Sequence, residues 1–309
     1  MHVLLINSPV RGIGPRRVVR SGYRVAGLFL ILLPGATGLA ALSTPATGAI
    51  RAGGAHTIVL KSDGTVWGWG YNYYGQLGDG TMTQRTSAVQ ASGLSGVVAV
   101  AASDYHSVAV KNDGKVWAWG NNGSGQLGDG TTTLRMAPVQ VGGLTGVISV
   151  AAGNEHSLAL KGNGTVWSWG ANGYGQLGNG VEGESHVIPV QVSGLTSVVA
   201  VSAGYDHSLA LKSDGTVWAW GHNASGQLGD GTTVHRAVPV QVTSLTGVVA
   251  VAVGGQRASL ALKNDGTAWV WGDNGNGQLG DGTTLSRSTP TQIFGLTGLV
   301  AVAAGATHG

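Results

Sequence analysis

The chain has 309 residues and no cysteine, so a small disulfide scaffold is excluded and the core has to stabilise the fold. Its 17 basic residues outnumber its 14 acidic residues, but five of the basic residues lie within residues 1–46. The rest of the chain carries 12 basic residues against 14 acidic ones. It lacks the basic stripe that neutralises phosphates, which argues against nucleic-acid binding.

Residues 1–46 read as a secretory signal peptide or an N-terminal membrane-targeting segment. Residues 1–24 contain five arginines and no acidic residue. An apolar run follows at 25–42, and small residues follow that run at 43–49. Pro34, Gly35 and Gly38 interrupt the run, so cleavage is favoured over an uncleaved membrane anchor. We expect a secreted or extracytoplasmic protein, which contacts a membrane only through this segment if it is not cleaved.

Residues 47–309 then contain five copies of one sequence repeat. Its W-x-W-G element begins at Trp67, Trp117, Trp167, Trp218 and Trp269, a spacing of 50 or 51 residues. All ten tryptophans of the chain lie in these five elements. A period of this length indicates one supersecondary unit per repeat, which buries its apolar face only by stacking on copies of itself.

Residues 147–196 illustrate one repeat. A β-branched strand at 147–152 precedes an alternating strand at 156–161, and Asn163-Gly164 then joins it to a third strand at 165–170. Asx-Gly between two alternating runs predicts a hairpin, because both central residues tolerate positive φ. In the third strand both tryptophans fall on one face and small residues on the other, as interdigitating stacked sheets require.

A fourth strand around 187–192 contains Pro189, which favours an outer edge position. Four short strands in about 50 residues, with no helical periodicity, predict an all-β fold with one β-propeller blade per repeat. The tryptophans are expected in the core rather than against a cofactor. The predicted blades are 49–96, 97–146, 147–197, 198–247 and 248–298, with the start of a sixth at 299–309.

These repeats resemble the regulator of chromosome condensation repeat family across residues 49–309. The family motifs G-x-x-H-S-x-A-L, W-x-W-G and G-Q-L-G appear here at 153–160, 167–170 and 175–178, with counterparts in every blade. The double-glycine signature of kelch propellers is absent. The resemblance implies a seven-bladed propeller.

The number of repeats does not reach seven, and two interpretations remain. The chain is either a truncated propeller with open ends, or a five-bladed ring in which 299–305 replaces the degenerate first strand at 47–53.

Several polar residues recur at fixed positions of the repeat and are candidates for binding sites. Histidines recur at one repeat position, but the fifth blade has Ala258 there, so a structural hydrogen bond to a neighbouring loop is the preferred interpretation. Glycine patterns such as 123–128 open turns rather than helices and are not dinucleotide sites. The aspartates of the G-Q-L-G-D-G loops are expected to cap Asx turns, and the arginines that follow could clamp loop to loop.

No catalytic, cofactor-binding or metal site is predicted, and the protein is not expected to be an enzyme. The chain has no G-x-S-x-G motif and no thiol nucleophile. One carboxylate per loop is too few for calcium. The loop 181–186, with Glu182, Glu184 and His186, is the most acidic segment of the chain. A surface loop is the preferred interpretation, and a partner contact or weak metal site is the second.

Function is expected where the repeats differ. Two variable segments per repeat, after the W-x-W-G element and before the H-S-L strand, are rich in Tyr and Asn, a composition that suits protein recognition. The candidate rim residues are Tyr71, Tyr73, Tyr74, Asp104, Tyr105, Asn154, Glu155, Tyr174, Tyr205, Asp206, His222, Gln256, Arg257 and Asp273. Solvent-exposed loops with no partner are the alternative.

Three functional hypotheses follow. The first is an exported propeller that binds a protein or cell-envelope partner through its rim. The second, implied by the family's eukaryotic founder, is nucleotide exchange on a small GTPase, although no repeat here carries the long insertion that the founder uses. The third is inhibition of a secreted enzyme, which some bacterial relatives with shorter repeats perform.

Overall fold

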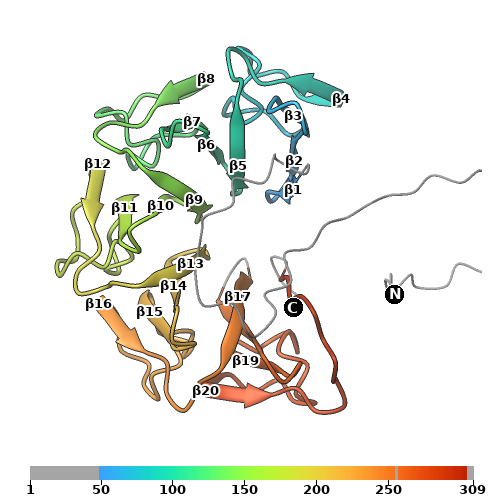
Figure 1. Ribbon diagram of the computed structural model, residues 1–309, viewed down its shortest axis with the longest axis vertical. Helices are drawn as coiled ribbons and strands as arrows, with labels where there is room; N and C mark the ends of the chain where they lie inside the picture. The colour runs from blue at the N-terminus through green and yellow to red at the C-terminus, as the bar shows by residue number, and fades with distance from the viewer. Residues whose placement is uncertain (1–48, 255–256, 305–309) are drawn as a thin grey trace, which may run out of the picture. The chain divides into compact units, whose positions relative to one another are not determined.

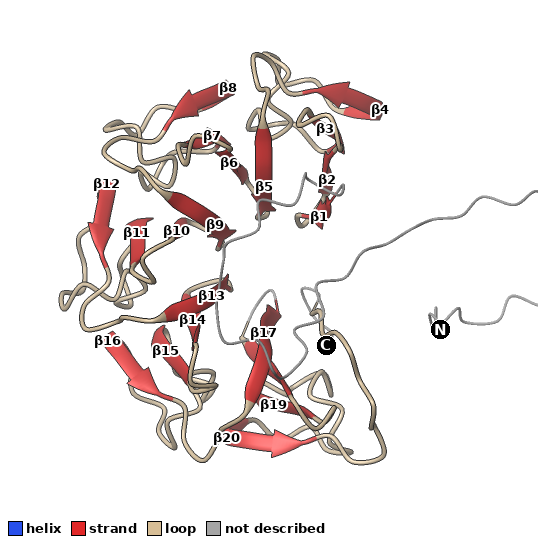
Figure 2. Cartoon of the chain, viewed as in Figure 1, coloured by secondary structure: helices blue, strands red, loops and turns tan. Residues whose placement is uncertain are grey.

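The computed structural model describes residues 49–254 and 257–304 (Figure 1). The predicted signal peptide and Gln256 lie outside the described residues. Twenty strands make up the regular structure of the described part, which confirms the all-β expectation (Figure 2). Within the described residues, no helix has the length and apolar character needed to cross a membrane.

The strands form five antiparallel sheets of four, each in chain order. The first sheet holds β1 (Ala49–Ala52), β2 (His56–Leu60), β3 (Val66–Gly70) and β4 (Arg85–Gln90). The second holds β5 (Val97–Ala102), β6 (His106–Lys111), β7 (Val116–Gly120) and β8 (Arg135–Gln140). The third holds β9 (Val147–Ala152), β10 (His156–Lys161), β11 (Val166–Gly170) and β12 (His186–Gln191).

The fourth sheet holds β13 (Val198–Ala203), β14 (His207–Lys212), β15 (Val217–Gly221) and β16 (Arg236–Gln241). The fifth holds β17 (Val248–Gly254), β18 (Ala258–Lys263), β19 (Ala268–Gly272) and β20 (Arg287–Gln292). The fourth strand of each sheet pairs only with the third, so the proline-bearing strands lie at an edge as expected.

The Asx-Gly segments form the predicted hairpin turns, but with a different geometry. Gly164 has φ of 78°, whereas Asn163 is not among the residues with positive φ. Asn163 instead accepts hydrogen bonds from the backbone and hydroxyl of Thr165 through its Oδ1. The turn therefore needs only one left-handed residue, and the Asx side chain stabilises it as an Asx turn.

The core consists of layers between consecutive sheets. In one layer Trp169 of β11 packs in the same buried cluster as Ala118 of β7, which confirms that a bulky face meets a small face. The second tryptophan of each pair in sheets two to five is fully buried. The equivalent Trp69 in the first sheet is 36% exposed, and the first tryptophan of every pair is only partly buried. The prediction that the tryptophans are core is therefore confirmed in full only for the second tryptophan of sheets two to five.

The described residues contain five sheets and no sixth. Residues 299–304 form no strand, and β1 fills the first-strand position of the first sheet by pairing with β2. The expected alternative, in which residues 299–305 replace that strand to close a ring, is therefore not seen. The first strands of consecutive sheets contact each other in order, from β1 to β17 (Figure 1).

Candidate partner-binding surface

The two sets of variable loops form one surface. In each sheet the first and third strands run in the same direction, so the loops that follow them emerge at the same edge. Contacts between sheets confirm the arrangement: the rings of Tyr74 and Tyr105 lie 5.3 Å apart, and Ser124 Oγ donates to Glu155 Oε2 at 3.0 Å. We call this the loop surface, made of residues 71–74, 104–105, 121–124, 154–155, 171–174, 205–206, 222–225, 257 and 273–276.

Backbone hydrogen bonds hold the two loops of each sheet together. Asn121 N donates to Tyr105 O at 2.9 Å, and Ala171 N donates to Glu155 O at 2.8 Å. His222 N and Asp206 O repeat this bond in the fourth sheet. The side chains on the loop surface are therefore displayed from a backbone that is fixed by the sheet.

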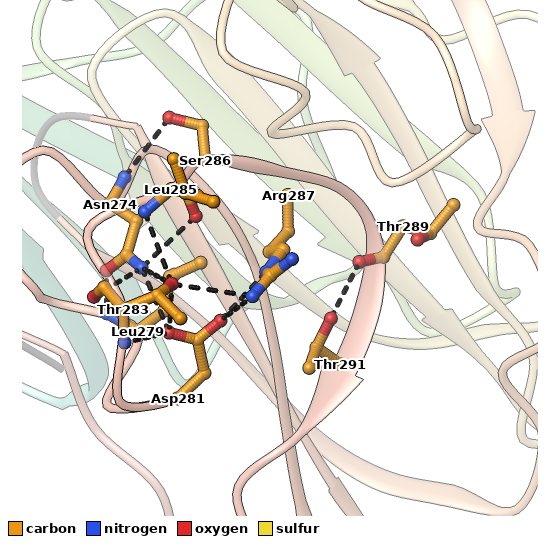
Figure 3. Close-up of polar contacts among 9 residues, drawn as sticks. All are labelled: Asn274, Leu279, Asp281, Thr283, Leu285, Ser286, Arg287, Thr289 and Thr291. Carbon is orange, nitrogen blue, oxygen red and sulfur yellow. Dashed lines mark hydrogen bonds and ion pairs between the residues drawn. The ribbon is translucent and has the colours of Figure 1, made fainter.

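One asparagine in each long loop is buried, forms hydrogen bonds within that loop and is not available to a partner. In the fifth sheet Asn274 is fully buried, its Nδ2 donates to Asp281 Oδ1, Thr283 O and Leu285 O at 3.0–3.1 Å, and its Oδ1 accepts from Leu279 N (Figure 3). The equivalents are Asn72, Asn122, Asn172 and Asn223, each 0% exposed. The asparagine content of these loops therefore reflects folding as well as recognition.

The loop aspartates cap Asx turns as expected, and the arginine clamp lies within one loop rather than between loops. Asp281 accepts from Thr283 N and from Arg287, whose Nη2 is 2.7 Å from Asp281 Oδ2 (Figure 3). The hydrogen bonds from Thr283 and then Arg287 lower the pKa of Asp281 to about 2. In the third sheet Asn179 and His186 occupy these positions and still bond, at 3.3 Å.

A cluster of tyrosines occupies the loop surface above the first two sheets. Tyr71 stacks with Tyr73 at 6.3 Å, and Tyr74 meets both Tyr73 and Tyr105 edge to face at 5.5 and 5.3 Å. Tyr73 is 60% exposed. The predicted residues Tyr71, Tyr73, Tyr74 and Tyr105 thus form one aromatic group, in which Tyr73 is exposed and the other three are half-buried. We call this group the tyrosine cluster.

A second aromatic group bridges the third and fourth sheets. The ring of Tyr174 lies 4.6 Å from His222 and 5.1 Å from His235, and the two imidazoles stack at 4.6 Å. His222 is 5% exposed, and burial, then Arg257, then His235 lower its pKa to about 4. Sequence reasoning missed His235, whose only signal is its position just before the loop arginine.

Carboxylates gather between these aromatic groups. Burial raises the pKa of Asp104, against a hydrogen bond from the Gly54 backbone. Burial and then Glu155 raise the pKa of Asp206, which Arg257 partly opposes. Burial raises the pKa of Tyr105, and the nearby Tyr205, Asp104, Tyr74 and Glu155 add to the effect. Asp104 and Glu155 therefore lie near Tyr105, and Asp206 lies near Glu155.

A pocket of about 200 Å³ opens where the first strands of the five sheets end. The lining comes from all five sheets, as residues 52–54, 102–104, 152–154, 203–205, Val253 and Ala304. The predicted rim residues Asp104, Asn154 and Tyr205 belong to this lining, and Asn154 is only 8% exposed. Arg257 is exposed, whereas Asp273 accepts from Gln278 Nε2 and Ser286 Oγ within its own loop.

The recurring histidines serve the contact between sheets. His106 Nε2 lies 2.8 Å from Ser157 Oγ in the next sheet, and His56, His156 and His207 repeat the pair with Ser107, Ser208 and Ser259. The partner is a strand serine and not the neighbouring loop that the sequence suggested. Burial lowers the pKa of each histidine, to about 3 at His106 and about 4 at His156.

Across the residues that the structure describes, His, Asp and Glu form no group of three or more that could hold a metal ion. Glu182 and Glu184 are exposed, while His186 is held by Asn179. The loop 181–186 is therefore a surface loop, as first expected.

Comparison with known proteins identifies the architecture. A family model described as the RCC1-like domain matches residues 35–309. The E3 ubiquitin-protein ligase HERC2 of Homo sapiens is 36% identical over 126 residues, which cover 39% of this chain and 3% of HERC2. The ultraviolet-B receptor UVR8 of Arabidopsis thaliana is 31% identical over 116 residues, 37% of this chain and 26% of UVR8. The chain thus spans only a small part of these curated relatives.

Solved structures show the same fold. Human WBSCR16 superposes with a TM-score of 0.74 at 28% identity, over 83% of this chain and 69% of that protein. Prp20p from Saccharomyces cerevisiae superposes with a TM-score of 0.60 at 22% identity, over 79% and 76%. The likeness to Prp20p extends to the fold alone.

Proposed function

Because the chain belongs to the RCC1-like domain family, we propose that it is a non-catalytic β-propeller that binds a protein partner at the loop surface. The observation that carries the proposal is the tyrosine cluster, four aromatic side chains grouped on loops that the sheets hold in place. Tyrosine supplies a large amphipathic contact area with only two side-chain torsions to restrict, which is why it anchors protein interfaces.

Related propellers support protein binding as the class of function. Prp20p is described with binding to Gsp1p and histones, and yeast RCC1 (Prp20) has been crystallised with Kap60. Those partners belong to Prp20p. At 22% identity none of them transfers to this chain, and nucleotide exchange on a small GTPase stays the second candidate without an observation in its favour.

Site-specific photo-crosslinking tests the surface. A photoreactive amino acid at Tyr73 of the full chain should capture a partner, because Tyr73 is exposed within the cluster. The same amino acid at Lys115, an exposed residue beside the hairpin turn at the opposite edge of the sheet, is the matched control. Equal adducts at both positions would contradict the proposal. With the captured partner purified, Tyr74→Ala should weaken binding about tenfold or more.

We further propose that the protein acts outside the cytoplasm, at the cell envelope or beyond it. The support is the sequence of residues 1–46, in which arginines, an apolar run and small residues follow one another. N-terminal sequencing of the chain recovered outside the cytoplasm should find a new terminus within residues 43–49. Recovery of the full-length chain in the cytoplasm alone would contradict export.

A further inference from the structure

One variable position of the repeat lines the pocket of about 200 Å³ at the ends of the first strands, which we call the strand-end pocket. It is the first residue of the variable segment that precedes the second strand of each sheet. In the first four sheets this residue is Gly54, Asp104, Asn154 and Tyr205. The rest of the described lining is glycine, alanine, Ser103 and Val253. The polar character of the pocket therefore comes mainly from a position at which these four repeats all differ.

Asp104 is the one charged side chain in the described lining. It is half-buried, and the ion pairs among the described residues do not include it. Burial raises the pKa of Asp104, although the carboxylate accepts a hydrogen bond from Gly54 N. A methyl group added at Gly54 would lie only 2.5 Å from Asp104 Oδ1. Glycine at this position thus lets the carboxylate lie against the first sheet, where no described cation neutralises it.

Asn154 adds a second acceptor to the pocket. The residue is 8% exposed, and its buried Oδ1 has no hydrogen-bond partner among the described residues. Its backbone N donates to Gly204 O and Tyr205 O, both at 3.3 Å, which fixes the residue against the fourth sheet. The equally buried Asn122, in contrast, uses its Oδ1 to accept from Leu127 N. A buried acceptor without a donor is unfavourable, so folding alone does not explain Asn154.

The residues next to the lining favour a cation. Glu155 and Asp206 directly follow Asn154 and Tyr205 in the sequence. Glu155 raises the pKa of Asp206, and Arg257 partly opposes this effect. Together with Asp104, the described residues of these variable segments carry three carboxylates and one guanidinium. Their summed field attracts a positively charged group to the pocket and repels a negatively charged one.

The chemistry of the pocket selects among cations. An ammonium group carries three donors and no acceptor, which suits a carboxylate and an amide oxygen on separate side chains. Asp104 and Asn154 belong to consecutive sheets, so diverging donors fit them better than the planar fork of a guanidinium. Alanines at 102, 152 and 203, together with Val253, offer an apolar wall for methylene groups.

We propose that the strand-end pocket binds a primary alkylammonium group. The ammonium lies between Asp104 and Asn154, and its methylene groups pack on the alanines and Val253. A lysine side chain of a protein partner and a free alkylamine share this chemistry. Because the binding can be measured without a protein partner, the proposal stands or fails separately from the proposed function.

A ligand-detected NMR titration of the full chain tests the pocket. Nα-acetyl-lysine methylamide should bind, whereas Nα-acetyl-norleucine methylamide, which has the methylene groups but no ammonium, should bind at least tenfold more weakly. Comparison with n-butylamine separates the two sources of the ammonium. Tighter binding of the lysine compound would identify a lysine side chain as the ligand, and equal or tighter binding of n-butylamine would identify a free amine.

Three variants place the binding in the pocket. Asp104→Asn removes the charge and should weaken binding of the lysine compound about tenfold or more. Asp113→Asn removes an exposed carboxylate at the opposite edge of the same sheet, so this matched control should bind like the wild type. Asn154→Leu keeps the size of the side chain without the acceptor and should also weaken binding.

Circular dichroism melts establish which variants are folded, and either pocket variant alone is sufficient for the test. Three results would each overturn the proposal: no binding of the lysine compound to the wild type, equal binding of the norleucine compound, or wild-type affinity in the folded pocket variants.

Discussion

The Nε2 atom of His207 lies 2.9 Å from the Oγ of Ser259, 52 residues later in the sequence and one sheet away. Ser259 Oγ donates its single proton to Gln227 O, so it can only accept from His207. His207 therefore carries its proton on Nε2, and its Nδ1 has no hydrogen-bond partner among the described residues. Burial, then His156 and His222, lower the pKa of His207 to about 3.

This histidine makes stability depend on pH with a definite sign. The ordinary histidine pKa is 6.5, so between that value and about 3 the unfolded chain binds a proton that folded His207 does not. Stability is fully present above pH 6.5 and falls as the pH is lowered, by up to about 1.4 kcal/mol per pH unit for one such residue.

His207→Gln keeps an N–H near the position of Nε2 but does not titrate. Its free energy of unfolding, measured by urea titration between pH 7.5 and 5, should fall with decreasing pH less steeply than that of the wild type, by about one proton. Identical slopes for the two proteins would show that His207 is protonated in the folded state.

The Asp129–Arg135 pair should contribute measurably to stability. Asp129 Oδ2 lies 2.7 Å from Arg135 Nη2 and accepts from its Nε at 2.8 Å, while the carboxylate is only 6% exposed. Burial raises the pKa of Asp129, but hydrogen bonds from Thr131 and Arg135 outweigh it, and the pKa is lowered. Asp129→Asn should cost about 1–3 kcal/mol of unfolding free energy.

Two comparisons sharpen that measurement. Asp113→Asn removes the charge from an exposed pair, Lys115 Nζ to Asp113 Oδ2 at 3.8 Å, and should cost less than about 0.5 kcal/mol. The double variant Asp129→Asn/Arg135→His copies the natural pair Asn179–His186 and should recover part of the loss. If Asp129→Asn costs no more than Asp113→Asn, the clamp is not a stabilising contact.

The blades were predictable because a period-two pattern and a Trp pair report directly on sheets that stack. The internal role of Asn72 was readable too, since an asparagine recurs second in all five variable segments, although composition alone suggested recognition. The cluster of Tyr174, His222 and His235 was not predictable, because Tyr174 belongs to the third sheet and meets the two histidines of the fourth sheet only through the packing of one sheet on the next. The exposure of Trp69 likewise depends on what packs against its sheet, which no repeat pattern contains.

Lys115→Thr should stabilise the second sheet. Trp67 Nε1 donates to Thr65 Oγ1 at 3.0 Å, and the same bond joins Trp269 to Thr267 at 3.1 Å. Trp117 has Lys115 at the corresponding position, and its Nε1 is buried without a partner among the described residues. In the third sheet Thr165 occupies this position and Trp167 Nε1 still has no partner among the described residues, so the gain requires the geometry of Thr65. In that geometry the hydroxyl supplies the acceptor and should add about 0.5–1.5 kcal/mol to the free energy of unfolding. Lys115→Ser and Lys115→Ala separate the hydroxyl from the loss of the lysine, and an equal gain for Ala would contradict this reasoning.

Trp169 and Trp69 occupy the same position in two sheets but should respond differently to the same substitution. Trp169 is fully buried and its Nε1 donates to Gln126 O at 2.8 Å, so Trp169→Phe loses a hydrogen bond and leaves a cavity. The expected cost is about 2–3 kcal/mol of unfolding free energy. Trp69 is 36% exposed, and Trp69→Phe should cost less than about 1 kcal/mol of unfolding free energy.

Urea titrations followed by circular dichroism give both values. Equal costs for the two substitutions would contradict this reasoning, because they would mean that Trp69 is packed as closely as Trp169.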